Sequence, residues 1–354
     1  MSSTGVPLGE LGGWPAILGP LCAGVDLTAE QARAAMTEIL RGDASGAQIA
    51  ALAVALRIKG ETVPEMTGLV AAMLEFAERV PLDPKLAASL VDTCGTGGDR
   101  SGSINVSTIG AFVAAGAGAR ICKHGNRAAS SQAGSADLLE ALGVAIDLGP
   151  SGVARCVEEA GMGFCFAARF HSAMRHAVPV RRELGVPTVF NFLGPLANPA
   201  RVCRQVVGVS DPRMAEKVMG VLVANGAVHA LVVFGHDGLD ELTTTDASTV
   251  LEFVDGAVST RIIDPLEFGI ARAERRSLVG GDAARNADLA RRVLSGESGP
   301  HRDIVVLNAA AALLVADLAP DLSTGVGMAR EAIDAGRASA VLDALGRVST
   351  EAVV

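Results

Sequence analysis

The stretch from Leu90 to Ser131 constrains the fold of this chain more than any other. It opens with the apolar end of a predicted buried strand, which leads into a glycine turn at Gly95–Asp99. A helix of small residues is expected over roughly Ser107–Ala117, followed by a second strand over Arg120–Cys122. That strand leads into a polar loop, Lys123–Ser131. Two strand ends that open into loops rich in Gly, Ser, Asn and cations are typical of an α/β protein that binds a phosphorylated ligand.

The glycine turn suits an anionic ligand. Gly95, Gly97 and Gly98 place three glycines in four positions, so the backbone can adopt positive φ and approach a ligand closely. Successive N–H groups of such a turn form an anion-binding nest, and the following helix adds unpaired donors at its positive end. A plain connection between strand and helix stays an open alternative, because Gly, Ser and Asn are common turn residues. The spacing is neither the G-x-G-x-x-G dinucleotide motif nor a P-loop.

The polar loop after the second strand favours phosphate binding. Two cations, an amide and two hydroxyls can neutralise and hydrogen-bond phosphate oxygens. A solvated charged loop is the alternative, but such a loop rarely follows a buried strand with so many small residues. The side chains concerned lie within nine residues: Lys123, His124, Asn126, Arg127, Ser130 and Ser131.

Longer motifs occur in a fixed order around these loops. DTCGTGGD, NVST, KHGNRAASS and GSADLLEALG (from Gly134) precede RRELG (from Arg181), FNFLGPLANP (from Phe190) and DGLDELT (from Asp237). In this order they resemble the anthranilate phosphoribosyltransferase family, and the similarity extends from about Thr28 to the C-terminus. Members of the family commonly have Gly after GTGGD, where this sequence has Arg100. The shape of the loop at that position is therefore open.

The resemblance implies a glycosyltransferase that moves the phosphoribosyl group of 5-phospho-α-D-ribose 1-diphosphate (PRPP) to the amine of anthranilate, the second step of tryptophan biosynthesis from chorismate. It also implies Mg²⁺ as cofactor and a homodimer formed through the helical domain. Carried over by motif, the PRPP-binding residues are Gly95, Gly98, Asp99, Ser103, Asn105, Val106, Ser107, Thr108, Lys123, His124, Gly125, Asn126, Arg127, Ala128, Ala129, Ser130, Ser131 and Ser135. The anthranilate-binding residues are Gly95, His124, Asn126, His171 and Arg181, and the metal ligands are Ser107, Asp240 and Glu241.

Several of these assignments have ordinary structural alternatives. Adjacent carboxylates such as Asp240-Glu241 usually mark a solvated turn, although Mg²⁺ prefers a few carboxylates together with substrate phosphates and waters. Arg181 could pair with Glu183 instead of a substrate carboxylate, and its neighbour Arg182 is a rival for the same role. His171 suits a semi-buried structural position nearly as well as a place in the substrate pocket.

Elsewhere the chain alternates predicted strands and helices. Nearly half of its residues are hydrophobic, with one Trp and no Tyr, which suits closely packed helices on a parallel sheet. We expect an α/β fold with a small discontinuous α-helical domain and a large α/β domain whose central, mainly parallel sheet is flanked by helices. The predicted division is a flexible extension over 1–24, a helical domain over 25–84 plus about 171–200, and a PRPP-binding domain over 85–170 plus 201–354. The alternation also predicts a strand over Val144–Asp147.

The charge of the chain narrows the classes of function. A net charge of −9 argues against non-specific nucleic-acid binding. We expect a cytoplasmic protein with neither membrane nor nucleic-acid partners, because no signal peptide or membrane-spanning run is recognisable. A pyrimidine nucleoside phosphorylase stays open and would need a nucleobase pocket in place of the Arg181 segment. A non-catalytic nucleic-acid-binding relative also stays open, and tight DNA binding at physiological salt would indicate it.

Overall fold

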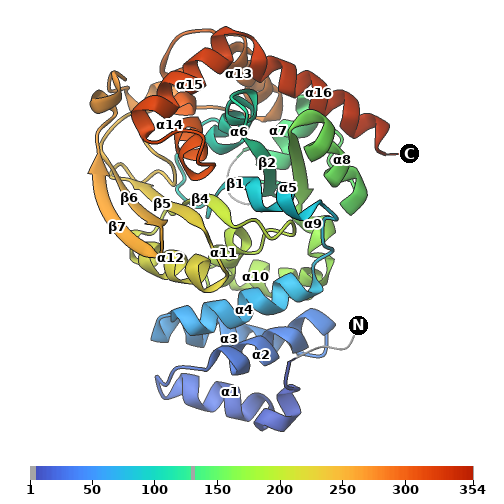
Figure 1. The fold of residues 1–354 in the computed structure, drawn as a ribbon. Coiled ribbons are helices and arrows are strands. Elements are labelled where there is room, and N and C mark those ends of the chain that lie inside the picture. Colours follow the sequence, from blue (N-terminus) through green and yellow to red (C-terminus); the bar gives the residue numbers. More distant parts are fainter. Residues whose placement is uncertain (1–4, 129–131, 354) are drawn as a thin grey trace.

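A seven-stranded sheet lies at the centre of the molecule (Figure 1). The computed structural model describes residues 5–128 and 132–353. Strands run in the order β3-β2-β1-β4-β5-β6-β7; the first five are mutually parallel, β6 pairs antiparallel to β5, and β7 pairs antiparallel to β6. The expected mainly parallel sheet is therefore confirmed. The bounds are β1 Leu90–Gly95, β2 Arg120–Gly125, β3 Met162–Phe166, β4 Arg204–Gly208, β5 His229–Gly235, β6 Ser248–Val254 and β7 Ala257–Ile263.

Helices cover both faces of the sheet, and side chains that alternate along a strand enter two different apolar clusters. Val206 and Leu231 pack with helices on one face, whereas their neighbours Val207 and Val232 pack with α12 and the N-terminal helices on the other. The helices of the first face are α6 Val106–Gly116, α7 Ser135–Ala141, α8 Pro150–Ala160, α13 Ala283–Leu294, α14 Pro300–Val315, α15 Leu322–Asp334 and α16 Arg337–Glu351. Helix α12 spans Ala215–Ala224, and the short α5 Pro84–Ser89 leads into β1.

Four N-terminal helices form a bundle beneath the second face of the sheet, drawn in blue in Figure 1. They are α1 Gly13–Cys22, α2 Ala29–Arg41, α3 Gly46–Lys59 and α4 Val63–Phe76. Thr28-x-x-Gln31 and Ser45-x-x-Gln48 have the spacing of capping boxes, and both boxes are present at the starts of α2 and α3. In each box the hydroxyl and the glutamine side chain satisfy backbone N–H groups that the helix leaves unpaired.

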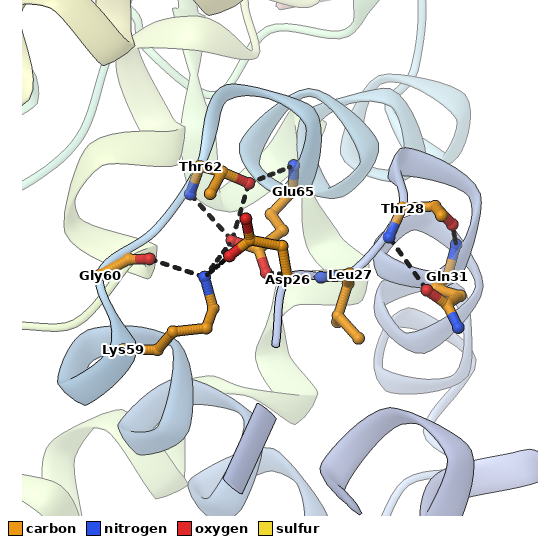
Figure 2. Close-up of polar contacts among 8 residues, drawn as sticks. All are labelled: Asp26, Leu27, Thr28, Gln31, Lys59, Gly60, Thr62 and Glu65. Carbon is orange, nitrogen blue, oxygen red and sulfur yellow. Dashed lines mark hydrogen bonds and ion pairs between the residues drawn. The ribbon is translucent and has the colours of Figure 1, made fainter. Parts of the chain in front are cut away.

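A buried ion pair joins the ends of these helices (Figure 2). Lys59 Nζ, at the end of α3, donates to Glu65 at 3.0 Å and to Asp26 at 2.6 Å. Glu65 is fully buried, and it also accepts the N–H of Leu27 and both the N–H and the hydroxyl of Thr62. Every one of these acceptors and donors comes from a loop or a helix end, so the cluster ties together the connections α1–α2 and α3–α4.

Part of the flexible extension predicted over 1–24 is helical in the structure. Residues Gly13–Cys22 form helix α1, in which Ile17 and Leu21 are buried in the bundle. The prediction was wrong because the glycines and prolines of this segment obscured a short apolar helix face. Gly12, with a φ of 90°, turns the chain into the helix rather than loosening it.

The strand predicted over Val144–Asp147 is absent from the described sheet. This segment is an extended connector whose alternate residues, Val144 and Ile146, are buried. The N–H of Ala145 donates to the hydroxyl of Ser349 in α16 at 3.0 Å. The predicted strand is wrong because the backbone here bonds to a helix side chain instead of a neighbouring strand.

The chain leaves the sheet after β3 and returns at β4. On the way it forms α9 Ala167–Phe170, α10 Val178–Leu184 and α11 Phe190–Leu193, of which α10 packs on α3 and α11 on α4. This return to the helical bundle is why we expect residues 171–200 to belong to a discontinuous helical domain, although the domain boundaries stay a prediction. Within residues 5–128 and 132–353, no helix is both long and apolar enough to cross a membrane.

Candidate active site

The carboxyl ends of the parallel strands meet at one edge of the sheet, and the strand order reverses between β1 and β4. Such a switch point is where open α/β sheets bind ligands. The glycine turn follows β1, the polar loop follows β2, and Asp240 and Glu241 follow β5. Three segments that are distant in the sequence therefore meet at this edge.

Asp240 lies against the backbone of β1 and β4. Its Oδ2 accepts the N–H of Gly97 at 2.7 Å, and a Cβ at Gly95 would overlap that carboxylate. A Cβ at Gly208 would overlap the carbonyl oxygen of Asp240. Gly97 and Gly98 have φ values of 68° and 84°, which favour glycine. Close approach and backbone shape therefore both call for glycine around Asp240.

Helix α6 begins beside the same carboxylates. Asn105 is its N-cap residue, and the N–H of Ser107 donates to Glu241 Oε1 at 3.2 Å. The side chain of Lys123 is almost wholly buried, and its ammonium donates to the hydroxyl of Ser107 at 3.2 Å and to the carbonyl of Thr93. A buried cation, a hydroxyl and a carboxylate are thus joined at the N-terminus of α6, where the helix dipole is positive.

The two adjacent carboxyl groups repel each other in a poorly solvated place. Burial, and then the negative charge of Asp99, raises the pKa of Asp240 to about 6. Burial and the charge of Asp240 raise the pKa of Glu241 well above its usual range, although Lys123 opposes this. A cation bound here would favour the ionised form of both groups.

The donor set at this edge fits Mg²⁺. In the part of the chain that the structure describes, no group of three or more His, Cys, Asp and Glu side chains is arranged to hold a metal by itself. Mg²⁺ commonly takes one or two protein carboxylates and completes its shell with substrate phosphate and water. Asp240 and Glu241, with the hydroxyl of Ser107, would supply the protein share of such a shell.

The first turn of α6 also holds Val106 and Thr108. Val106 is buried in the apolar cluster of that face. The Oγ1 of Thr108 is buried and has no hydrogen-bond partner among the described residues. Their assignment to PRPP binding stays a prediction.

The loop between the glycine turn and α6 is ordered by its own side chains. Asp99 accepts the N–H of Ser101 at 3.2 Å, and the hydroxyl of Ser101 donates to that of Ser103 at 3.0 Å. Arg100 is exposed and has a φ of 54°, a left-handed conformation that a non-glycine residue adopts at a cost. The backbone here therefore keeps a shape that suits glycine although the residue is Arg.

The loop after β2 is attached to the start of α7. The hydroxyl of Ser135 donates to the carbonyl of Asn126 at 3.2 Å, and a Cβ at Gly125 would overlap that hydroxyl. The Asn126 side-chain oxygen accepts the N–H of the next residue at 2.8 Å. The predicted site residues Ala129, Ser130 and Ser131 lie outside the described residues.

Arg127 is paired within the protein. Its guanidinium bonds to Asp137 at 2.9 Å and to Glu140 at 2.5 Å, both on α7, and it lies over the ring of Phe166. The N–H of Ala128 also donates to Asp137. Arg127 therefore serves to hold the loop on α7, and its predicted contact with PRPP would require these ion pairs to be shared.

His124 and His171 form a buried pair of rings. Their centroids lie 5.3 Å apart in an edge-to-face arrangement. Burial, then the neighbouring His171, lowers the pKa of His124 well below its usual range, and burial also lowers the pKa of His171. His171 bonds to the carbonyl of Ala197 at 2.8 Å, whereas His124 Nε2 is buried without a partner among the described residues. Both rings are therefore neutral near pH 7, and Nε2 of His124 has unused hydrogen-bonding capacity among the described residues.

Arg181 lies on α10 with its guanidinium 5.7 Å from the ring centroid of Phe190. Burial lowers its pKa, with no acidic group among the described residues opposing that shift. The alternative pairing with Glu183 is thus not observed in the described ranges, and Arg182 is exposed. A half-buried arginine without a counter-ion is suited to bind an anionic group of a ligand.

Asp92, a buried carboxylate beneath the site, was not among the site residues predicted from the sequence. Asp92 in β1 accepts the N–H of His124 at 3.1 Å and the side-chain amide of Asn198 at 2.8 Å. Burial raises its pKa, and Lys123 opposes that shift. We call residues 167–203, between β3 and β4, the return segment. Asn198 of this segment also donates to the carbonyl of Cys122, so the pair joins the return segment to β1 and β2. An acidic residue inside an apolar strand was the signal that could have revealed it.

Comparisons with known proteins agree with this geometry. The family profile "Glycosyl transferase family, a/b domain" matches residues 87–339, and "Glycosyl transferase family, helical bundle domain" matches residues 15–77. The anthranilate phosphoribosyltransferase of Nocardioides sp. is 55% identical over 335 residues, covering 93% of this chain and 97% of that protein. The chain belongs to the anthranilate phosphoribosyltransferase family.

Other similar proteins and solved structures belong to the same family. The anthranilate phosphoribosyltransferase of Salinispora arenicola is 53% identical, covering 93% of this chain and 95% of that protein. The crystal structure of the Thermus thermophilus enzyme has a TM-score of 0.89 at 42% identity, covering 94% of this chain and 99% of that one. The Saccharomyces cerevisiae enzyme in complex with PRPP and Mg has a TM-score of 0.87 at 28% identity, covering 96% and 98%. These similarities favour the transferase over the phosphorylase and the nucleic-acid-binding alternatives.

Proposed function

We propose that this protein transfers the phosphoribosyl group of PRPP to the amine of anthranilate and releases diphosphate. The observation that carries the proposal is the carboxylate pair Asp240–Glu241, held by backbone N–H groups of the glycine turn and of α6 at the switch point of the sheet. Burial makes both carboxylates costly to ionise, so the pair weighs against stability unless a cation joins it. It has a clear role beside a ligand that carries diphosphate and arrives with Mg²⁺.

The diphosphate and phosphate groups of PRPP would lie between the glycine turn and the N-terminus of α6. Ser107 and Lys123 supply a hydroxyl and a positive charge there, and the N–H groups of the turn and helix supply further donors. Mg²⁺, held by Asp240, Glu241 and the hydroxyl of Ser107, would neutralise negative charge on the diphosphate. Asn126 and Ser135, which are joined by a hydrogen bond, are assigned to the same ligand.

Anthranilate would bind on the side of the return segment. Arg181 is suited to its carboxylate as a bidentate partner, and His124 offers a neutral ring nitrogen to orient the amine. In the reaction the C1–O bond to diphosphate breaks, a C1–N bond forms, and the amine loses one proton. An arylamine is already unprotonated near neutral pH, so orientation and electrostatic stabilisation of the leaving group are sufficient, without a protein nucleophile.

The loss of anthranilate fluorescence in the presence of PRPP and Mg²⁺ tests this function. We expect Asp240→Asn to slow the reaction about 100-fold, because it removes charge that acts on the reacting groups. We expect Arg181→Ala to raise the KM for anthranilate roughly 10- to 100-fold while leaving the KM for PRPP within about twofold, since a hydrogen-bonded charge is lost on one substrate only. Arg182→Ala, one residue away and exposed, is the matched control and should change neither KM.

Different results of this assay would contradict the reaction itself and the assignment of Arg181. A wild-type protein that consumes no anthranilate at any Mg²⁺ concentration contradicts the transferase, and phosphorolysis of pyrimidine nucleosides is then the next assay. An active protein in which Arg182→Ala, and not Arg181→Ala, raises the anthranilate KM assigns the carboxylate contact to the rival arginine.

We further propose a cytoplasmic homodimer that forms through the helical bundle. The bundle exposes two large apolar side chains at helix ends or loops, Ile58 at 82% and Val25 at 54%, and apolar residues are enriched in the cores of homodimer interfaces. Light scattering coupled to gel filtration measures the mass directly. A mass near that of one 35.9 kDa chain at micromolar concentration would contradict the dimer.

A further inference from the structure

A segment more than 170 residues downstream of the glycine turn is paired with the loop that follows it. We call residues 278–286 the strap; they follow β7 and run into the first residues of α13 Ala283–Leu294. The N–H of Ile104 donates to the carbonyl of Leu278 at 3.1 Å, and the N–H of Gly280 donates to the carbonyl of Gly102 at 2.8 Å. Ser103 and Val279 form an antiparallel bridge between these bonds. The strap therefore fixes the backbone that leads into α6.

The strap ends in a buried amide that contacts the N-cap of α6. The side chain of Asn286 is 1% exposed. Its Nδ2 donates to Asn105 Oδ1 at 2.9 Å, and its Oδ1 accepts the N–H of Gly281 at 2.8 Å. Asn105 Nδ2 in turn donates to the carbonyl of Ala133 at 3.0 Å, at the far end of the polar loop. These amides form one directed chain from the strap through α6 to the loop after β2.

The sequence of the strap makes room for this amide. A Cβ at Gly280 would overlap Asn286 Oδ1, and a Cβ at Gly281 would lie 2.5 Å from Arg285 Cδ. Arg285, on the outer side, donates from Nε to the carbonyl of Gly280 at 3.2 Å. The two glycines thus let the strap fold tightly onto the side chain that it delivers to Asn105.

We propose that Asn286 is a positioning residue for PRPP: it sets the orientation of the Asn105 carboxamide and so holds the N-terminus of α6 at a fixed separation from the segment Ala133–Ser135 that begins α7. This inference rests on the proposed function, since both segments are assigned there to PRPP. Asn286 itself lies behind Asn105 and acts through it. The anthranilate contact at Arg181 lies on α10 and forms no part of this chain.

The direction of each hydrogen bond predicts what the substitution Asn286→Asp does to this chain of amides. In Asn286→Asp, the new carboxylate keeps the volume and still accepts the N–H of Gly281, but it cannot donate to Asn105 Oδ1. Asn105 must then either face an acceptor with its own oxygen or rotate by half a turn. The rotation satisfies position 286 and sacrifices the bond to Ala133. Either result breaks one hydrogen bond of the chain Asn286–Asn105–Ala133 while all three residues keep side chains of the same size.

The test measures PRPP binding directly and separately from turnover. Isothermal titration of PRPP with Mg²⁺, in the absence of anthranilate, should give a Kd about tenfold weaker for Asn286→Asp and for Asn286→Ala, as expected when a buried acceptor loses its donor. The KM for PRPP should rise by the same factor, whereas the KM for anthranilate should stay within about twofold. Asp282→Ala is the matched control: it removes the N-cap of α13 and lowers the melting temperature, but leaves the Asn286–Asn105 bond in place and PRPP affinity unchanged.

Two results would overturn the proposal. One is a folded Asn286→Asp protein with wild-type affinity for PRPP. The other is an equal loss for both substrates, or a loss shared by Asp282→Ala, because that pattern marks general destabilisation. Failure of the transferase function is distinguishable from both, since it removes turnover from the wild type while the titration of PRPP still compares the variants.

Discussion

At Gly208 the end of β4 passes so close to Asp240 that a Cβ would overlap the carbonyl oxygen of that residue. The same holds at Gly95, where a Cβ would overlap the carboxylate itself. The position of Asp240 thus depends on glycine, which has no Cβ, at one position in β1 and one in β4. At the scale of single residues, the site is shaped as much by these close approaches as by its polar groups.

We therefore expect Gly208→Ala to displace Asp240. The substitution should destabilise the protein by about 2 kcal/mol, in the range of other forced overpacking, and slow phosphoribosyl transfer at saturating substrate. Urea denaturation and initial rates measure the two effects.

Gly327→Ala is the matched control for this substitution. Gly327 lies exposed inside α15, and a Cβ there meets nothing within 4 Å. Alanine should stabilise that helix by up to about 1 kcal/mol and leave the rate unchanged. Equal stability of both variants would show that β4 can relax away from Asp240.

At the scale of elements, the buried pair Lys59–Glu65 connects the ends of helices rather than their faces. Burial lowers the pKa of Lys59, but hydrogen bonds to Asp26 and Glu65 outweigh it, so the pKa is raised. Glu65 accepts bonds from three other groups in the connecting loops. We infer that this cluster specifies which helix ends lie together, because buried polar groups need particular partners whereas apolar helix faces do not.

We expect Glu65→Leu to cost about 3 kcal/mol of unfolding free energy, because Lys59 loses its buried partner and the N–H groups of Leu27 and Thr62 lose their acceptor. Urea denaturation followed by circular dichroism measures the loss. Glu297→Gln, which breaks the exposed pair with Arg292, is the control and should leave the melting temperature unchanged. A Glu65→Leu protein as stable as the control would show that the bundle does not depend on this cluster.

At the scale of the whole molecule, the helical bundle and one face of the sheet share a single apolar cluster. The histidine pair lies where the return segment joins these parts, since His171 bonds to Ala197 of that segment and its ring contacts that of His124 in β2. Both rings are buried and neutral. Protonating either would place a charge in this junction.

This arrangement predicts a loss of stability in mild acid. Because burial lowers the pKa of His171 below its unfolded value of about 6.5, the unfolded chain binds the proton more readily as the pH falls below that value. The contribution of His171 is therefore fully present above about pH 6.5 and is lost as the pH falls through the folded pKa. His171→Asn should lose less unfolding free energy than the wild type between pH 7.5 and pH 5.0, as measured by urea denaturation at each pH. An identical loss in both proteins would contradict this account.

The sequence by itself determined the features that depend on local pattern. The order of strands and helices from Leu90 to Cys122 followed from glycine turns and apolar runs, and the capping boxes at Thr28 and Ser45 followed from their spacing. The family was recognisable because its long motifs lie at strand ends and in the turns and helices next to them, where several residue types are set by chemistry as well as by packing. Local signals failed at residues 1–24, where glycine and proline hid a helix.

Only the tertiary structure decided which distant groups meet. Alternation over Val144–Asp147 is the same whether the backbone bonds to a strand or to the hydroxyl of Ser349, so periodicity could not choose between them. Asn198, a partner of Asp92, lies 106 residues away, and Asn286, a partner of Asn105, lies 181 residues away, and no spacing rule connects them. Strand order and helix packing create those contacts, because the folded chain satisfies each buried polar group with whichever neighbour the topology delivers.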